Sequence, residues 1–211
     1  MQSKTFFERA RAQLSLDTPP ALHDPNVVPD KGDHELNAEM TKLWAVRPIR
    51  PAAVLVPVVD RAEPTVLLTQ RSAHLPQHPG QISFPGGKID PTDETPLAAA
   101  LREAREEVGL DASVVEPIGY LDLYMTTQGY RIVPAVARIA PDYRLTLNPA
   151  EVDEAFEVPL QFLMDLSNHQ KHSRDWEGIK RYYFEIPFEQ RRIWGITAGI
   201  LRNLSEKIYA A

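Results

Sequence analysis

The sequence predicts the α/β (α+β) class, with a mixed β-sheet sandwiched between helices. Two apolar runs at 52–59 and 65–69 are rich in β-branched residues and are separated by a turn at 60–64, which is typical of adjacent strands. Their unbroken apolar character indicates burial on both faces, as happens when helices cover a sheet on two sides. A helix with a clear start and end at 96–108 is the third observation.

Composition limits the organisation of the chain and its classes of partner. Its 211 residues, 43% of them hydrophobic, are enough for one sizeable core, and no Gly/Ser-rich linker divides them. We expect one domain at 50–211, with an N-terminal helix and a proline-rich loop at 1–49 packing on it. The net charge of −6 argues against a nucleic-acid or anionic-membrane surface.

Two features that the sequence lacks limit the possible chemistry and the expected cellular compartment. There is no cysteine, which excludes disulfides, thiolate metal sites and a cysteine nucleophile. The N-terminus lacks the apolar core of a signal peptide, and no stretch approaches the length of a membrane span. We therefore expect a cytoplasmic protein.

The first fifty residues are expected to form a helix and then a loop. The stretch 3–15 has the spacing of an amphipathic helix, and its apolar face is expected to dock on the domain or on a second subunit, which leaves a homodimer open. The stretch 17–33 contains four prolines, too many for regular structure, and predicts a surface loop. The apolar positions of the helix are Phe6, Phe7, Ala10 and Leu14.

The central helix at 96–108 has recognisable ends. A long segment at 72–81 and a glycine turn at Gly86–Gly87 lead toward it. Thr95 is a candidate N-cap, Pro96 stands at the first helical position, and Gly109 follows the last turn. One side carries an apolar stripe that we expect to pack against the sheet, formed by Leu97, Leu101, Ala104 and Val108.

The segments after this helix alternate between strands and helices. We expect strands at 114–123 and 131–139, joined by a polar turn at 124–130, and a short helix at about 159–165.

The C-terminal part begins with a basic hexapeptide, HQKHSR, at 169–174. It is expected to be a surface loop, although recognition of a terminal phosphate is an open alternative. A strand is predicted at 181–186 and a closing helix at 193–208, with Trp194 in the core.

The central helix also carries a concentrated negative charge. Glu103, Glu106 and Glu107 stand at i, i+3 and i+4, so that their carboxylates fall within one arc. A solvated charged face is the ordinary interpretation of such a pattern. Two features favour a divalent cation instead: Ala99 and Ala100 are expected to clear space one turn earlier, and the glycine turn allows main-chain carbonyls to come close. Mg²⁺ prefers such oxygen ligands, together with substrate phosphates.

These residues carry a family resemblance. The run 102–110, REAREEVGL, resembles the second half of the Nudix box, R-E-U-x-E-E-x-G-U with U aliphatic, and seven residues separate Glu94 from Arg102, as in the box. The loop 88–93 departs from the usual box by one inserted residue. The resemblance extends over about residues 50 to 205 and implies the Nudix fold.

A second stretch resembles one branch of that family. Residues 67–72, LLTQRS, and 80–87, GQISFPGG, are similar to the signature that precedes the box in coenzyme A diphosphatases. The inserted loop, of GGKxDxxD form, is also similar to that branch. Pro76 departs from it, because the signature has an arginine there. The resemblance implies hydrolysis of coenzyme A or acyl-CoA to 3′,5′-ADP and 4′-phosphopantetheine or its acyl form.

The resemblance also suggests roles for individual residues. Arg102 is expected to orient the glutamates, and the general base is left open between Glu103, Glu151 and Glu154. The expected ligands of Mg²⁺ or Mn²⁺ are Gly86, through its carbonyl, and Glu103, Glu106 and Glu107. The residues expected to contact the small-molecule substrate are Arg71, Gly87 and Lys88.

Two alternatives remain open on the sequence alone. Within enzymes, the substrate could be another nucleoside diphosphate conjugate such as ADP-ribose. In a different class, the chain could be a Nudix-fold module that binds a nucleotide without cleaving it. The crowded glutamates argue against the second alternative, because a pure binding module has no need of them.

Overall fold

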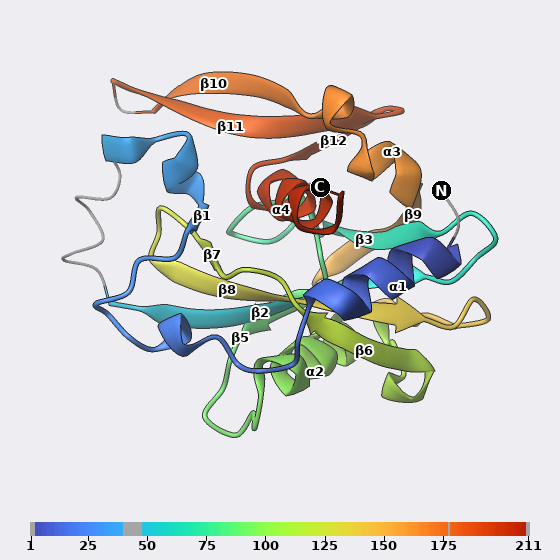
Figure 1. Cartoon of the computed structure of the whole chain (residues 1–211). Coiled ribbons are helices and arrows are strands. Elements are labelled where there is room, and N and C mark those ends of the chain that lie inside the picture. The colour runs from blue at the N-terminus through green and yellow to red at the C-terminus, as the bar shows by residue number, and fades with distance from the viewer. Residues whose placement is uncertain (1–2, 40–47, 177, 210–211) are drawn as a thin grey trace.

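The computed structural model describes residues 3–39, 48–176 and 178–209. Within these residues, nine strands form one mixed sheet, and three more form a small antiparallel sheet (Figure 1). The strands of the main sheet are β1 (Lys31–Gly32), β2 (Arg50–Val59), β3 (Thr65–Arg71), β4 (Ile82–Ser83), β5 (Gly86–Lys88), β6 (Val115–Tyr120), β7 (Tyr124–Met125), β8 (Tyr130–Ile139) and β9 (Val152–Pro159). The small sheet contains β10 (Gln170–Trp176), β11 (Ile179–Phe188) and β12 (Arg191–Trp194).

Helices cover the main sheet on both faces, as the sequence predicts. One face packs against α2, and the other lies beneath α4, with α1 and α3 beside it (Figure 1). The small sheet packs on α4 in turn, so α4 lies between the two sheets. The helices are α1 (Ser3–Gln13), α2 (Pro96–Val108), α3 (Leu160–Met164) and α4 (Ile196–Tyr209), with short 3₁₀ turns η1 (Pro20–Leu22), η2 (Asp33–Glu35), η4 (Ala112–Val114) and η5 (Leu166–Asn168).

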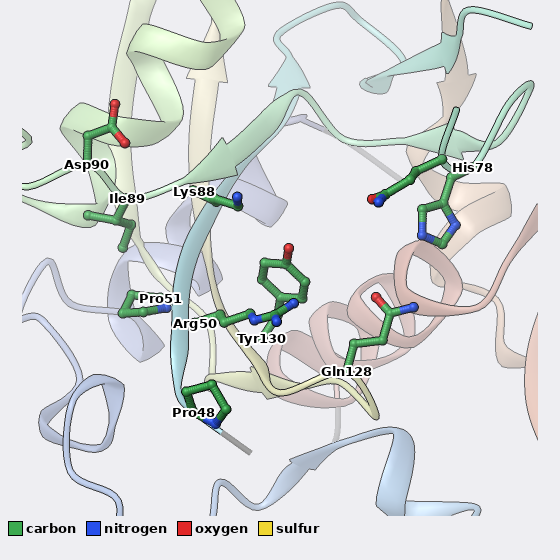
Figure 2. Close-up of a pocket in the computed structure, with 10 residues that line it drawn as sticks. Pro48, Arg50, Pro51, His78, Lys88, Ile89, Asp90, Gln128 and Tyr130 are labelled. Atoms are coloured by element: carbon green, nitrogen blue, oxygen red, sulfur yellow. The ribbon is translucent and has the colours of Figure 1, made fainter. Parts of the chain in front are cut away.

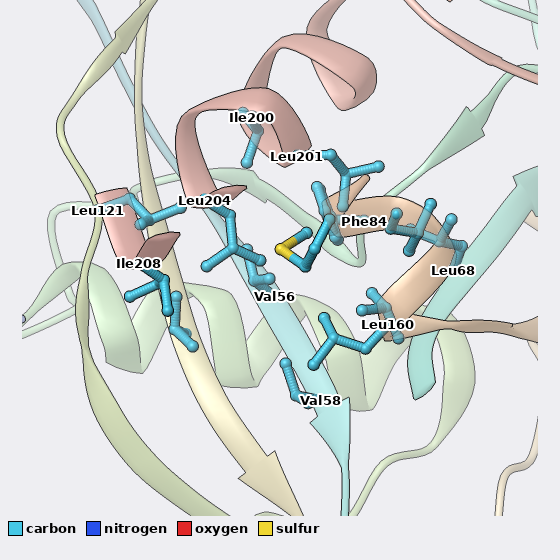
Figure 3. Close-up of a cluster of buried hydrophobic side chains, with 14 of the residues drawn as sticks. Val56, Val58, Leu68, Phe84, Leu121, Leu160, Ile200, Leu201, Leu204 and Ile208 are labelled. Carbon is cyan, nitrogen blue, oxygen red and sulfur yellow. The ribbon is translucent and has the colours of Figure 1, made fainter. Parts of the chain in front are cut away.

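The strand β2 lies at the centre of the main sheet. It pairs in parallel with β8 along the whole length of both strands, and it joins β3 in a hairpin. Its side chains alternate between two apolar clusters: Val56 packs with Leu204 and Ile208 of α4 (Figure 3), whereas Leu55 packs beneath α2 with Ala104. The expected burial of this strand on both faces is therefore confirmed.

The predicted N-terminal helix is present as α1. Phe6 is fully buried in the same cluster as Ile208 of α4. The proline-rich segment after α1 is mostly irregular, as expected, but it also contains η1, β1 and η2.

A buried arginine of β8 holds this segment in place. The guanidinium of Arg131, a residue only 2% exposed, donates to the main-chain carbonyl of Ala21 and to those of Asp24 and Val27 at 2.6 and 2.8 Å. The N-terminal residues that the structure describes thus share the core of the main sheet. The division at residues 49 and 50 stays a prediction.

Two of the longer strands, β9 and β10, were not expected from the sequence. The hexapeptide 169–174, predicted as a surface loop, lies largely in β10, which pairs with β11 along its whole length. Every side chain of β10 is exposed, so no apolar alternation marks it as a strand, and its hydrogen bonds come from a distant partner. The segment 152–159 forms β9, which pairs with β3.

The closing helix begins later than predicted. Residues 191–194 pair with β11 as β12, and Gly195, with a φ of 64°, turns the chain into α4 at Ile196. Trp194 is half-buried rather than in the core, and its ring meets the Tyr183 ring edge-on with centroids 5.4 Å apart.

Smaller corrections concern the elements around β8. The strand predicted at 114–123 is confirmed only at Val115–Tyr120, because η4 precedes it. The expected turn at 124–130 begins with β7, and the short helix α3 is confirmed. Among the helices that the structure describes, none has the length and apolar character needed to cross a membrane.

Candidate active site

The helix that carries the glutamates begins and ends where the sequence predicts. The Thr95 hydroxyl accepts a hydrogen bond from the N–H of Ala98 at 3.1 Å, and Gly109 adopts a left-handed φ of 66°. The expectation that Ala99 and Ala100 clear space for a ligand is wrong. Both are fully buried beneath α2, where small side chains let the helix approach β2 closely.

Gly86 and Gly87 lie in the strand β5 rather than in the expected turn. They pair with Val54 and Ala53 of β2. A Cβ on Gly86 would lie 2.4 Å from the carbonyl oxygen of Ala53, and a Cβ on Gly87 would lie 2.4 Å from the carboxyl carbon of Glu103. The two glycines therefore let β5 pass between β2 and the glutamates of α2.

Glu107 is the most enclosed of the three glutamates. It is only 4% exposed, it accepts a hydrogen bond from the N–H of Gly86 at 3.2 Å, and one of its oxygens lies 4.0 Å from the guanidinium of Arg71. Burial raises the pKa of its carboxyl to about 7, and the nearby charge of Glu103 adds to this increase. One N–H and one distant arginine are weak compensation for a buried carboxylate.

The other two glutamates are progressively more open. The Glu103 side chain is 19% exposed and that of Glu106 is 55% exposed. Burial raises the pKa of Glu103, although its hydrogen bond with Arg102 acts in the opposite direction. The three carboxylates, which were predicted to share one arc of the helix, thus differ in exposure: Glu107 is buried, Glu103 is partly exposed and Glu106 is largely exposed.

Arg102 connects the glutamates to the acidic loop that precedes α2. Its guanidinium donates to Glu103 at 2.9 Å and to Glu106 at 3.3 Å. It also donates to the carbonyl of Lys88 at 3.1 Å and to both carboxylate oxygens of Asp93, at 2.9 and 3.1 Å. The hydrogen bond from Arg102 lowers the pKa of Asp93. Arg102 therefore contacts two of the three glutamates and also Asp93, which sequence reasoning missed, while its orienting role stays a prediction.

The structure places the two remaining base candidates differently. The carboxylate of Glu151 accepts a hydrogen bond from Asn148 at 3.0 Å. Burial is the main cause that raises the pKa of Glu103 and of Glu107, and the negative charge of Glu151 is a smaller one. The Glu151 carboxylate is therefore close to the glutamates of α2. Glu154 instead pairs with Arg191 of β12 at 2.6 Å and is not brought to the glutamate cluster.

A cleft opens beside the glutamates, over the edge formed by β2, β5 and β8. Its two adjoining parts, of about 270 and 890 Å³, both include Lys88 and Tyr130 in their walls. The inner part is walled by Arg71, Phe84, Gly86, Gly87, Ile132 and Ile200, among others. Around the outer part stand Arg50, His78, Lys88, Gln128 and Tyr130 (Figure 2).

All three residues predicted to contact the substrate therefore line this cleft. Arg71 also has a buried Nε for which the described residues supply no hydrogen-bond acceptor. A buried donor without an acceptor is costly, and an anionic oxygen in the cleft would satisfy it. Lys171 and Arg174 of the basic hexapeptide lie on exposed β10, and neither lines the cleft.

Sequence reasoning also missed two residues of the outer cleft. Arg50 is the first residue of β2 and Tyr130 the first of β8, and the two are direct partners in the parallel register. The guanidinium carbon of Arg50 lies 5.5 Å from the centre of the Tyr130 ring. Nothing in the sequence marks them, because strand pairing brings them together from eighty residues apart.

The donors at the inner end of the cleft fit a divalent cation by their chemistry. In the described part of the chain, no three acidic or histidine side chains stand close enough to hold a metal ion as they lie. Arg102 takes up oxygens of Glu103 and Glu106. The buried Glu107 carboxylate and the nearby Glu103 nevertheless supply the oxygen ligands that a hard cation prefers.

Comparison with known proteins identifies the family of the chain. The model of the NUDIX domain matches residues 49–182, and the chain belongs to the Nudix family. Nudix hydrolases of Yersinia pestis and Yersinia pseudotuberculosis, both named uncharacterized Nudix hydrolase NudL, are 42% identical to the chain over 159 residues, covering 75% of the chain and 80% of each relative.

Among solved structures, the chain is similar to a Caenorhabditis elegans Ap4A hydrolase in a binary complex. The likeness has a TM-score of 0.45 and 23% identity and covers 52% of this chain and 80% of that chain. The family match and the NudL relatives identify the protein as a Nudix hydrolase, a family whose activity is on nucleoside diphosphate derivatives and whose members generally use a divalent metal ion.

Proposed function

We propose that the protein hydrolyses the pyrophosphate linkage of coenzyme A or an acyl-CoA, with Mg²⁺ or Mn²⁺ as cofactor. One observation carries the proposal: the stretch that resembles the coenzyme A diphosphatase signature forms a wall of the cleft beside the glutamates. Arg71, Phe84 and Gly87 of this stretch all line the inner part. Arg71 lies 4.0 Å from Glu107 and Gly87 lies beside Glu103, so the stretch borders both the carboxylates and the space open to a substrate.

The reaction is the addition of water across a phosphoric anhydride. One phosphorus gains the oxygen of water, and the bridging oxygen leaves with the other phosphate, which yields 3′,5′-ADP and 4′-phosphopantetheine or its acyl form. A divalent cation held by Glu103, Glu106, Glu107 and the Gly86 carbonyl would neutralise the charge of the phosphates. Phosphate binding by Arg71 and Lys88 would position the anhydride beside these groups.

A general base must accept a proton from the attacking water. Glu151 is the better candidate from outside the helix, because its charge acts on Glu103 and Glu107 while Glu154 is engaged by Arg191. Glu103 remains the candidate within the helix. Comparing Glu151→Gln with Glu154→Gln tests this choice: the first should lower kcat much more than the second.

The test of the proposed function is direct. The purified protein is incubated with Mg²⁺ or Mn²⁺ and, separately, with coenzyme A and ADP-ribose, and the products are resolved by chromatography. Release of 3′,5′-ADP from coenzyme A supports the proposal. Cleavage of ADP-ribose alone would keep the Nudix chemistry and reject the substrate.

Matched variants connect that activity to the glutamates. Glu106→Gln should abolish turnover without unfolding the protein, because the side chain is largely exposed, whereas Glu63→Gln, in the exposed turn between β2 and β3, should change nothing. Retained activity in Glu106→Gln would remove that carboxylate from the mechanism. Pro76→Arg restores the arginine of the signature next to cleft residues and should improve coenzyme A turnover if that position contacts substrate.

A further inference from the structure

Three strands present Arg50, Tyr130 and Lys88 to the outer part of the cleft. Arg50 and Tyr130 are direct partners in the pairing of β2 with β8. Lys88 is the β5 partner of Ala52, two residues further along β2. Side chains alternate along a strand, so Arg50 and Ala52 point to the same face of the sheet. All three cleft residues stand around one cavity of about 890 Å³ (Figure 2).

The pair formed by Arg50 and Tyr130 is a platform for a planar ring. The guanidinium carbon of Arg50 lies 5.5 Å from the centre of the Tyr130 ring, within the range of a cation–π contact. Both groups are flat and stack on nucleobases. The side chain of Tyr130 is half-buried, which limits the entropy lost when a base settles on it.

The charge of this cavity favours an anion. In the described part of the chain, neither Arg50 nor Lys88 forms an ion pair, whereas most of the other arginines at the surface do. Among the described residues of the wall, Asp90 is the one that is acidic, and its carboxylate lies 3.9 Å from the guanidinium of Arg102. Two uncompensated cations at one cavity are notable in a protein of net charge −6, and they suit a phosphate group.

The spacing along the sheet fits one half of a nucleotide substrate. Gly86, beside Glu107, pairs with Val54. From there, the rise of a strand puts Lys88 about 7 Å and Arg50 about 13 Å further along the sheet. A diphosphate at the glutamates would thus have a ribose near Lys88 and a base near Arg50.

The inner part of the cleft suits the other half. Its wall includes Phe84, Ile132 and Ile200, which offer apolar contact to a pantetheine or acyl chain.

We propose that the outer part of the cleft is a nucleotide subsite, in which Tyr130 supports the base while Arg50 and Lys88 bind a phosphate carried by the ribose. This inference rests on the proposed function, because it assigns the half of coenzyme A that is released as 3′,5′-ADP. It makes Arg50 and Lys88 the residues that distinguish a 3′-phosphorylated nucleotide from one without that phosphate.

Calorimetric titration in the presence of Mg²⁺ tests the subsite without any turnover. The wild-type protein should bind 3′,5′-ADP at least about tenfold more tightly than 5′-AMP, since the extra phosphate gains charge-assisted hydrogen bonds. Arg50→Gln and Lys88→Gln should each reduce this ratio severalfold, and the double variant should bring it close to unity. Arg144→Gln, which removes an exposed arginine away from the cleft, should leave the ratio unchanged.

Tyr130→Leu distinguishes the contribution of the base to binding from that of the phosphate. It should weaken the binding of both nucleotides by a similar factor, about tenfold, because stacking on an aromatic ring is lost while the cations remain. Thermal melting of each variant checks that it is folded. Unequal weakening that falls only on 3′,5′-ADP would overturn the role given to Tyr130.

The outcomes separate this inference from the proposed function. If coenzyme A is cleaved but 3′,5′-ADP and 5′-AMP bind equally, or if Arg50→Gln weakens both equally, the subsite is refuted and the function stands. If coenzyme A is not cleaved but 3′,5′-ADP is preferred in a manner that depends on Arg50, the subsite stands and the function is refuted.

Discussion

Replacement of Gly87 by alanine tests whether the position of the Glu103 carboxylate matters for catalysis without disturbing the stability of the fold. The added Cβ would lie 2.4 Å from the carboxyl carbon of Glu103 and 2.6 Å from both of its oxygens. Ordinary contact requires 3.4 Å or more, so the carboxyl group must withdraw by about 1 Å. Only the end of a flexible side chain has to move, and the backbone of β5 can stay in place.

The expected effect therefore falls on catalysis. A displacement of about 1 Å at a catalytic group lowers rates by about 100-fold. We expect Gly87→Ala to lower kcat by about that factor while changing the free energy of unfolding by less than about 1 kcal/mol.

Gly86→Ala is the matched control, because it adds the same methyl group one residue earlier. There the Cβ would lie 2.4 Å from the carbonyl oxygen of Ala53 and 2.6 Å from the Cα of Val54, at a φ of 152°. These are main-chain atoms of the central strand, which cannot withdraw. This variant should lose about 3 kcal/mol of stability or more, from overpacking and backbone strain together.

Urea unfolding and initial rates of coenzyme A hydrolysis at saturating Mg²⁺ measure the two effects. Wild-type kcat in Gly87→Ala would show that Glu103 does not need its place beside β5. A loss of stability in Gly87→Ala as large as that in Gly86→Ala would show that the clash falls on the backbone, and either result would refute the reasoning.

Three further predictions concern stability. Hydrogen bonds, above all with Arg61, lower the pKa of Glu157 from 4.5 to about 2. The ionised Glu157 therefore stabilises the fold fully above pH 4.5, and this stabilisation is lost as the pH falls through 2. In urea unfolding, Glu157→Gln should cost up to about 3 kcal/mol at pH 7 and progressively less below pH 4. Arg131→Gln should cost about 2 kcal/mol or more and increase amide hydrogen exchange at residues 21–27, since three carbonyls lose a charged donor. Phe6→Ala should cost about 3–5 kcal/mol by the same unfolding assay, because its ring is fully buried beside α4.

The parts of the fold that could be predicted are those specified by neighbouring residues. The limits of α2 follow from Thr95, Pro96 and Gly109, whose effects act within one helical turn. The hairpin of β2 and β3 follows from two β-branched runs separated by a short turn. Both could be predicted because no distant partner decides them.

The parts that could not be predicted depend on distant pairing. The strand β10 has exposed side chains throughout, and only its pairing with β11 makes it a strand. Arg50 meets Tyr130 because β2 and β8 run in parallel, a register that neither segment encodes alone. Glu151 and Glu154 are three residues apart and equally acidic, yet the pairing of β9 directs one toward the glutamates and the other toward Arg191.

The same distinction explains why the glutamates of α2 are not equivalent. Spacing alone puts Glu103, Glu106 and Glu107 on one arc, but α2 lies against β5, and that contact encloses Glu107 while it leaves Glu106 in solvent. A carboxylate enclosed with a single N–H donor opposes folding, because burial disfavours its charged form. This unfavourable burial occurs at the end of the cleft where Arg71 also has a buried donor without an acceptor among the described residues. The Glu107 carboxylate and the Arg71 guanidinium lie 4.0 Å apart and only partly satisfy each other, and a bound cation and a bound phosphate would supply the partners that each still lacks.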